Sequence, residues 1–286
     1  MFRSPSFPSH VTLPTDRTLI MGVLNVTPDS FSDGGKWLSF ADAVSHAEQL
    51  CDDGADIIDV GGESTRPGSA RITANEEQQR IGAVVDELVR QNMVVSVDTV
   101  HASTARIMAD RGAAIINDVS GACWDSQMAA TMATIEAAVV IQHWRGFPGS
   151  ASERVLDEGA LATVIDDLRG QLDTVYAAGV SSERIIIDPG LGFAKTVDAS
   201  WDVFAGLPAL HEAFSHPVLI GASRKRFIQS LATDTISVDD LTAATTVLSA
   251  LHGAWAVRVH APKRNTAAIA AARAWVRGTM RNNNGQ

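Results

Sequence analysis

Met93-Val94-Val95-Ser96-Val97-Asp98, residues 93–98, is a short apolar run that ends on a carboxylate. Seven other short apolar runs are likewise followed by polar residues. The eight runs are Leu19–Leu24, Asp56–Val60, Met93–Val97, Ala114–Ile116, Ala138–Gln142, Arg184–Ile187, Pro217–Gly221 and Ala254–Val259. Short β-branched runs separated by helical patterns are typical of parallel strands, which need helical crossovers. Eight of them in one chain predict an α/β fold, a (β/α)₈ TIM barrel.

Helical signals lie between these runs. Thr73 is followed three residues later by Glu76, the pattern of a capping box, and apolar residues then recur at helical spacing over 81–88. An alanine-rich stretch, Asn265–Val276, predicts the closing helix. We therefore expect one barrel domain over residues 18–278, preceded by a flexible arm over 1–17 and followed by a tail over 279–286.

Composition excludes several classes of partner. The 286 residues carry a net charge of −10, and both nucleic acids and anionic membranes favour a basic face. No run approaches the roughly 18–20 apolar residues of a spanning helix. Residues 1–17 lack the apolar segment of a signal peptide, and two cysteines form neither a disulfide framework nor a metal pair. We expect a cytoplasmic protein that binds small molecules.

The active site of such a barrel lies where the strands end. Asp98, Asn117 and Asp188 directly follow the third, fourth and sixth runs, so they should surround one floor. Carboxylates accept hydrogen bonds, and an amide both donates and accepts, which suits a flat heterocycle with an amidine-like edge. Each of the three could instead orient a neighbouring loop backbone. His143, after the fifth run, is either a pocket wall or a structural residue.

Positive charge gathers after the seventh and eighth runs. Ser223-Arg224-Lys225-Arg226 and Arg258-Val259-His260 adjoin where phosphates often bind in this fold, so an anionic substrate group is expected. Strand alternation could turn Lys225 into the barrel. Arg224 and Arg226 could equally be surface ion pairs.

Two loops are rich in glycine and polar residues. Asn25–Gly35 follows the first run and Gly61–Gly68 the second. Two loops that cover the same end of the barrel suggest a reaction that excludes water, although either loop could be a solvated turn.

These blocks together resemble the dihydropteroate synthase family of bacterial folate synthesis over roughly residues 19–277. The blocks that carry the resemblance are Asn25–Gly35, Gly61–Gly68, Val97–Thr99, Asn117–Gly121, Asp188–Lys195, Ser223–Phe227 and Arg258–His260. The resemblance implies a (β/α)₈ barrel, a homodimer, and a transferase that joins 7,8-dihydropterin-6-ylmethyl diphosphate to p-aminobenzoate with Mg²⁺ and releases pyrophosphate. Members of the family are targets of sulfonamides, which mimic p-aminobenzoate.

The resemblance also implies roles for single residues. Asp98, Asn117, Asp188 and Lys225 would bind the pterin, and Asn25, Arg258 and His260 would meet the diphosphate, with Asn25 also a ligand of Mg²⁺. The candidates for the p-aminobenzoate site are Phe31, Thr65, Arg66, Pro67, Phe193 and Ser223. Asp98, Lys225, Arg258 and His260 are the expected catalytic residues. The family's dissociative mechanism implies a pterin cation beside Asp98 and a departing diphosphate held by cations.

Departures from the family pattern and rival functions also bear on the expectation. Ala261 stands where the family usually has Asp or Asn, and Ala122-Cys123-Trp124 replaces a glycine-rich stretch. A methyltetrahydrofolate corrinoid methyltransferase would share the pterin floor but needs no diphosphate pocket. A catalytically silent paralogue would have lost chemistry-bearing residues that are present here. A barrel hydrolase would need a nucleophile arrangement that this sequence lacks.

Overall fold

The protein closes eight parallel strands into a barrel, as the apolar runs predict. The computed structural model describes residues 3–27, 40–63 and 71–283. The strands are β1 Leu19–Asn25, β2 Ile57–Gly61, β3 Val95–Asp98, β4 Ile115–Asp118, β5 Ala138–Gln142, β6 Ile185–Asp188, β7 Leu219–Ile220 and β8 Ala256–Val259. Their order around the sheet is β6-β5-β4-β3-β2-β1-β8-β7. The Ile187 amide donates to Pro217 O at 2.9 Å beside a parallel bridge to Val218, which joins β6 to the start of β7.

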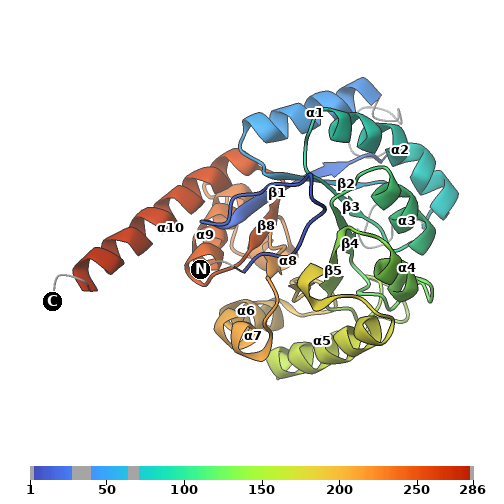
Figure 1. Ribbon diagram of the computed structural model, residues 1–286. Coiled ribbons are helices and arrows are strands. Elements are labelled where there is room, and N and C mark those ends of the chain that lie inside the picture. The colour runs from blue at the N-terminus through green and yellow to red at the C-terminus, as the bar shows by residue number, and fades with distance from the viewer. Residues whose placement is uncertain (1–2, 28–39, 64–70, 284–286) are drawn as a thin grey trace.

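Helices form the outer layer of the barrel (Figure 1). They are α1 Phe40–Asp52, α2 Ala74–Arg90, α3 Ala102–Asp110, α4 Met128–Thr134, α5 Ala160–Ala177, the 3₁₀ turn η1 Ser182–Arg184, α6 Val197–Ala205, α7 Leu207–Ala213, α8 Arg226–Gln229, α9 Val238–Leu251 and α10 Pro262–Asn283. The predicted cap of α2 is present, because Thr73 Oγ1 accepts from the Glu76 amide at 3.2 Å. The closing helix α10 runs to Asn283, so residues 279–283 of the expected tail are helical, and its far end projects from the barrel in Figure 1.

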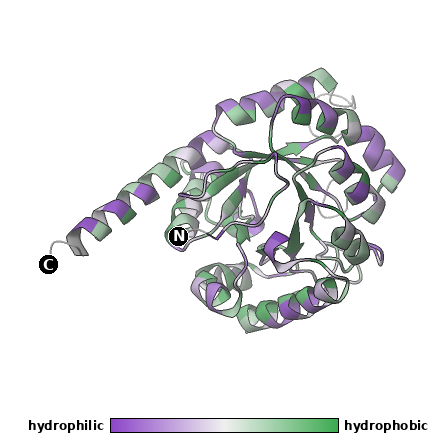
Figure 2. Ribbon diagram, in the orientation of Figure 1, coloured by the Kyte–Doolittle hydropathy of each residue, from purple (hydrophilic) through white to green (hydrophobic). Residues whose placement is uncertain are grey.

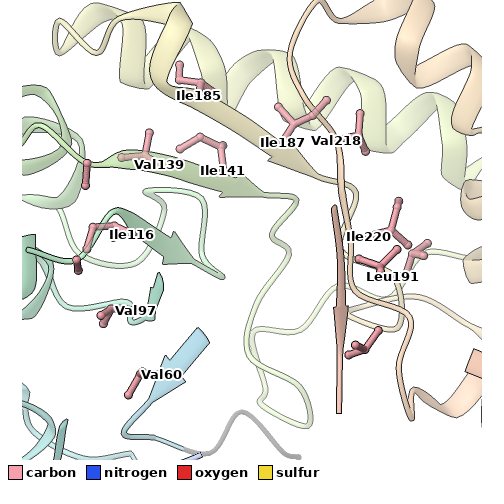
Figure 3. Close-up of a cluster of buried hydrophobic side chains, with 14 of the residues drawn as sticks. Val60, Val97, Ile116, Val139, Ile141, Ile185, Ile187, Leu191, Val218 and Ile220 are labelled. Atoms are coloured by element: carbon pink, nitrogen blue, oxygen red, sulfur yellow. The ribbon is translucent and has the colours of Figure 1, made fainter. Parts of the chain in front are cut away.

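Strand alternation divides the apolar residues between two layers. Val60, Val97, Ile116, Val139 and Ile187 point outward and pack in the layer beneath the helices (Figure 3). A second cluster fills the lower part of the barrel interior, toward the amino ends of the strands. Its members are Leu19, Met21, Ile57, Ala114, Ile115, Ala138, Val140, Ile186, Leu219, Trp255 and Ala256. The strands are hydrophobic and the outer helix faces hydrophilic in Figure 2. The interior is therefore a packed core, above which the inward positions become polar.

The N-terminal segment contacts the lower end of the barrel, a contact that the expectation of a flexible arm did not include. Phe7, Val11 and Leu13 pack against the lower cluster, and the Phe7 ring centre lies 6.2 Å from that of Trp255. The Ser6 amide donates to Glu183 O at 2.7 Å. The segment therefore covers the amino end of the barrel, opposite to the carboxyl ends of the strands.

Across residues 3–27, 40–63 and 71–283, no helix is both long and apolar enough to cross a membrane. Cys51 and Cys123 are both free thiols.

Candidate active site

Polar side chains occupy the inward positions at the carboxyl ends of the strands. Asp59 of β2, Asp98 of β3 and Asn117 of β4 point to the same side as Arg258 of β8. The register aligns Asp98 with Asn117, whereas Asp59 pairs with Ser96, two residues before Asp98. Three of the four were expected from the sequence, and Asp59 was not.

Arg258 bridges two of these carboxylates. Its Nε donates to Asp59 Oδ2 at 2.6 Å, and its Nη2 donates to Asp98 Oδ2 at 2.9 Å. Burial alone would lower the Arg258 pKa, but Asp59 and Asp98 more than offset this and raise it. Burial also raises the pKa of Asp98 to about 7, against the opposing effect of Arg258. The guanidinium is therefore a fixed cation, whereas the Asp98 carboxyl can exchange a proton near neutrality.

Two buried acceptor atoms lack partners in this cluster. Asn117 Nδ2 donates to Asp59 Oδ2 at 3.2 Å, which turns the amide oxygen Oδ1 the other way. Among the described residues, neither Asn117 Oδ1 nor Asp59 Oδ1 has a hydrogen-bond partner. Buried polar atoms are nearly always satisfied, so unpaired acceptors indicate a missing donor. A ligand with N–H groups would supply one.

Asp188 and Lys225 form the other side of the floor. Asp188 Oδ1 accepts from the Gly190 amide at 2.7 Å, and Lys225 Nζ lies 3.5 Å from the centre of the Phe193 ring. Burial raises the pKa of Asp188 to about 6. Burial, with a contribution from Arg258, lowers the pKa of Lys225 to about 7. Asp98, Asp188 and Lys225, the charged residues predicted to bind the pterin, thus have pKa values shifted by burial and by one another, which is characteristic of functional sites.

Arg224, the basic residue directly before Lys225, has a left-handed backbone and points away from the floor. Arg224 has φ +57°, which is unusual for a residue other than glycine. Its guanidinium makes two hydrogen bonds of 2.9 Å to Asp239 at the start of α9. Arg224 therefore forms the surface ion pair that was the alternative for this residue. Arg226 is exposed and also lies outside the floor. Only Lys225 of this basic run takes part in the floor.

Ser223 and His260 adjoin at the ends of β7 and β8. Ser223 Oγ lies 3.0 Å from His260 Nδ1 and accepts a hydrogen bond of 3.3 Å from the His260 backbone amide. Burial, together with Arg258, lowers the pKa of His260 to about 3. His260 is therefore a neutral hydrogen-bonding group rather than part of the positive charge.

Asn25 ends β1 beside Gly61. A Cβ on Gly61 would lie 3.7 Å from Asn25 Oδ1 and 3.9 Å from Asp98 Oδ2, so an amide oxygen and a carboxylate oxygen flank one point. Mg²⁺ prefers such oxygen ligands and commonly takes one or two from protein and the rest from phosphate and water. In the part of the chain that is described, no three His, Cys, Asp or Glu side chains cluster as a metal site. The donor set fits Mg²⁺ only in company with a phosphate-bearing substrate.

Several predicted positions lie elsewhere. Phe31, Thr65, Arg66 and Pro67 fall outside the described residues. Asp118, the neighbour of Asn117 in the sequence, points outward and accepts from the Ser120 amide at 2.8 Å, so it holds the next loop. His143 is buried against Asp167 and Lys195, which favours a structural role.

Sequence reasoning also missed a contact on the rim. Arg71 Nε lies 3.0 Å from Glu63 Oε1, and the Arg71 guanidinium carbon stacks 3.8 Å above the Phe147 ring. This places a cation between the ends of β2 and β5. A basic residue beyond a glycine-rich loop was the available sequence signal.

Ala261 directly precedes Pro262, the first residue of α10. An alanine there offers no side-chain acceptor to the free amides of the first turn, unlike the Asp or Asn usual in the family. The side chain of Asn265 instead donates to Ala261 O at 2.8 Å. The departure affects the helix start and leaves the floor residues unchanged.

Comparisons with known proteins agree with this geometry. A family model described as pterin binding enzyme matches residues 21–260. The dihydropteroate synthase of Mycobacterium leprae is 43% identical over 268 residues, covering 90% of this chain and 93% of that protein. A dihydropteroate synthase from Clostridium difficile, crystallised with pteroic acid, has a TM-score of 0.82 at 36% identity and covers 90% of this chain and 96% of its own.

A third relative carries a pterin phosphate. Dihydropteroate synthase from Anaplasma phagocytophilum, with bound 6-hydroxymethylpterin-monophosphate, has a TM-score of 0.81 at 35% identity and covers 91% of this chain and 99% of its own. Family model, sequence relatives and solved structures therefore agree over most of the chain. The chain belongs to the dihydropteroate synthase family of pterin-binding enzymes, which are transferases.

Proposed function

We propose that the chain joins 7,8-dihydropterin-6-ylmethyl diphosphate to p-aminobenzoate and releases pyrophosphate. The observation that carries this proposal is the buried, unpaired Asn117 Oδ1 among Asp98, Asp188 and Lys225. The acceptors Asp98, Asn117 and Asp188, together with the Lys225 ammonium, match the donor edge and the ring carbonyl of a pterin. Asp188 receives the amino and N–H edge, Asn117 Oδ1 accepts a further N–H, and Lys225 donates to the carbonyl.

The diphosphate is held by Arg258 and His260. Arg258 has N–H groups beyond those it gives to Asp59 and Asp98, since a guanidinium has five donors. His260 is neutral in the free protein and can donate without a fixed charge. Asp59 is a positioning residue in this proposal, because it is fully buried and fixes the Nε side of Arg258.

Mg²⁺ would be held by Asn25 and by oxygens of the substrate, with Asp98 Oδ2 adjacent. When bound, it neutralises charge on the diphosphate and makes pyrophosphate a better leaving group.

The chemistry follows a dissociative route. The bond between the methylene carbon and the diphosphate oxygen breaks, its electron pair leaves with pyrophosphate, and a pterin cation remains. The Asp98 carboxylate stabilises this cation, while Arg258 stabilises the departing anion. The aniline nitrogen then bonds to the methylene carbon and loses its proton. No protein nucleophile is required.

The p-aminobenzoate ring rests against Phe193, with Ser223 toward its other end. The Phe193 ring already lies over Lys225, which sets it next to the pterin floor. Phe31, Thr65, Arg66 and Pro67 remain our predictions for the rest of this site. By the same resemblance we expect sulfonamides to compete for it.

The homodimer and the cytoplasmic location are also part of the proposal. Two unpaired cysteines suit a reducing compartment. The exposed apolar residues Leu231, Ile236, Leu248 and Leu251 offer surface for a second copy. Light scattering of the purified protein tests the dimer, and a monomeric mass would refute it.

Pyrophosphate release tests the function. The purified protein is assayed with Mg²⁺ and pterin diphosphate, with and without p-aminobenzoate. Release that depends on p-aminobenzoate and yields dihydropteroate supports the proposal. Pterin binding without release would refute the activity and favour a silent paralogue.

A further inference from the structure

Lys195 is a buried ammonium that the proposed chemistry does not use. Its side chain is 3% exposed and lies behind the loop that joins β6 to α6. Nζ is 2.9 Å from Gly190 O, 3.2 Å from Phe193 O and 2.9 Å from His143 Nδ1. An ammonium has three donors, and these three acceptors use all of them. Burial lowers the pKa of Lys195 to about 7, and in its protonated form the ammonium is fully hydrogen-bonded inside the protein.

The third acceptor is itself held in place. When Lys195 is protonated it donates to His143 Nδ1, and the ring proton is then on Nε2, which is 3.0 Å from Asp167 Oδ2. Burial, with a contribution from Lys195, lowers the pKa of His143 to about 2, so the ring stays neutral. Asp167, His143 and Lys195 thus form one hydrogen-bonded chain from α5 to the β6–α6 loop. A neutral, oriented imidazole is a structural acceptor here.

The loop that Lys195 closes has an unusual backbone. Gly190, Gly192 and Ala194 have φ of +65°, +73° and +45°. The left-handed conformation is unfavourable for an alanine, so it persists only where surrounding contacts determine it. The two carbonyls that Lys195 binds belong to Gly190 and Phe193, which lie within this alternating segment. The ammonium is therefore the centre around which the loop folds.

Phe193 lies between two of the left-handed residues. Its backbone oxygen is bound to Lys195 on the inner side, and its ring contacts Lys225 Nζ at 3.5 Å from the ring centre. Gly190, the first left-handed residue of the loop, donates its amide to Asp188. The same short segment thus contacts Asp188, a carboxylate predicted to bind the pterin, and carries the Phe193 ring that is assigned to the p-aminobenzoate site.

We infer that Lys195 is a positioning residue for p-aminobenzoate, which acts by holding the Gly190–Lys195 loop so that the Phe193 ring stays against Lys225. This inference rests on the proposed function, because it takes Phe193 as a wall of the p-aminobenzoate site. Lys195 touches neither substrate. Its loss should therefore weaken use of the aniline more than binding of the pterin diphosphate.

The test is a double-mutant cycle between Lys195→Met and Phe193→Leu, with Lys263→Met as an exposed lysine control. Lys195→Met is expected to raise the KM for p-aminobenzoate about tenfold, ~1.4 kcal/mol, and to change pterin diphosphate affinity by less than about threefold. In the Phe193→Leu background, Lys195→Met should add less than about threefold, because the ring it positions is gone. Lys263→Met should behave as wild type.

Each outcome decides the inference separately from the function. Absence of p-aminobenzoate-dependent pyrophosphate release in the wild-type protein would refute the proposed function itself. An unchanged KM in Lys195→Met, or full multiplication of the two effects, would overturn the positioning role alone. An unchanged KM in Phe193→Leu would also overturn it, since Phe193 would not line the site.

A second variant covers the case in which Lys195→Met does not fold. His143→Leu keeps the lysine but removes one of its three acceptors. We expect a smaller rise in the same KM, which again disappears in the Phe193→Leu background. A wild-type KM in folded His143→Leu, where Lys195→Met cannot be measured, would overturn the inference.

Discussion

Replacing Asp59 with asparagine should weaken binding of pterin diphosphate without disturbing the barrel. Asp59 is fully buried, and its Oδ2 lies 2.6 Å from Arg258 Nε and 3.2 Å from Asn117 Nδ2. Asparagine has the same shape and keeps one carbonyl oxygen for Arg258. It removes the charge that holds the Nε side of the guanidinium, so Arg258 is then drawn toward Asp98 alone, 2.9 Å away.

The magnitude follows from this one contact. A hydrogen bond to a charged group contributes about 1.5–3 kcal/mol and a neutral one about 0.5–1.5 kcal/mol. Arg258 keeps its charge, so Asp59→Asn removes the charge from one side of this bond only, and we expect a loss of about 1–1.5 kcal/mol at most. Because each 1.4 kcal/mol is tenfold in affinity, the Kd for pterin diphosphate should rise about 5- to 13-fold.

Titration calorimetry with pterin diphosphate and Mg²⁺, in the absence of p-aminobenzoate, measures this change. Asp56→Asn is the matched control, because Asp56 also binds an arginine at 2.6 Å, Arg17, but precedes β2 at the other end of the barrel. It should lower Tm and leave the Kd unchanged. Wild-type affinity in Asp59→Asn, or an equal loss in Asp56→Asn, would refute the positioning of Arg258.

Asp98→Asn should slow turnover far more than it weakens pterin diphosphate binding, because a neutral amide keeps the shape but loses the charge that faces the cation; stopped-flow and calorimetry compare the two, and equal losses would contradict the role. Burial raises the pKa of Asp98 and lowers that of Lys225, each to about 7. Activity should rise as Asp98 ionises and fall as Lys225 loses its proton, giving a bell-shaped kcat/KM profile with a maximum near neutrality; a profile flat from about pH 6 to 8 would be inconsistent with this. Phe7→Ala removes a ring packed near Trp255 and should lower the free energy of unfolding by about 1–2 kcal/mol in urea, with KM unchanged; an unaltered urea midpoint would mean that the arm adds no stability.

The barrel and its polar rim follow from sequence because both depend on short-range patterns. The run over Met93–Val97 predicts a strand, and the next residue, Asp98, lies at the carboxyl end where the barrel opens. Strand alternation then explains why Asn117 points inward while Asp118 points outward and holds a loop. Neighbours in sequence have opposite functions because they lie on opposite faces.

Asp59 was missed for a related reason. The predicted site residues follow the ends of the runs, whereas Asp59 lies inside its run, at an inward position two residues before the end of β2. A carboxylate inside an apolar run is itself a signal. Lys195 differs, because its side chain folds back onto carbonyls of its own loop and onto His143, which is 52 residues away. No local pattern predicts that contact. Arg224 was ambiguous until its left-handed backbone and its partner Asp239 were known.

Under the proposed function, the contacts of Arg258 would serve both substrate binding and turnover. Asp59 and Asp98 share the Arg258 guanidinium, Lys225 interacts with Asp98 and Asp188, and burial raises the pKa of Asp98 to about 7. A diphosphate draws on the free N–H groups of Arg258, and the arginine then shares its charge with a new anion. In the proposed mechanism, Arg258 would keep its bonds to Asp59 and Asp98 while its remaining N–H groups stabilise the departing pyrophosphate. Asp59 stays bound to Arg258 throughout, which is why its charge, more than its shape, should matter.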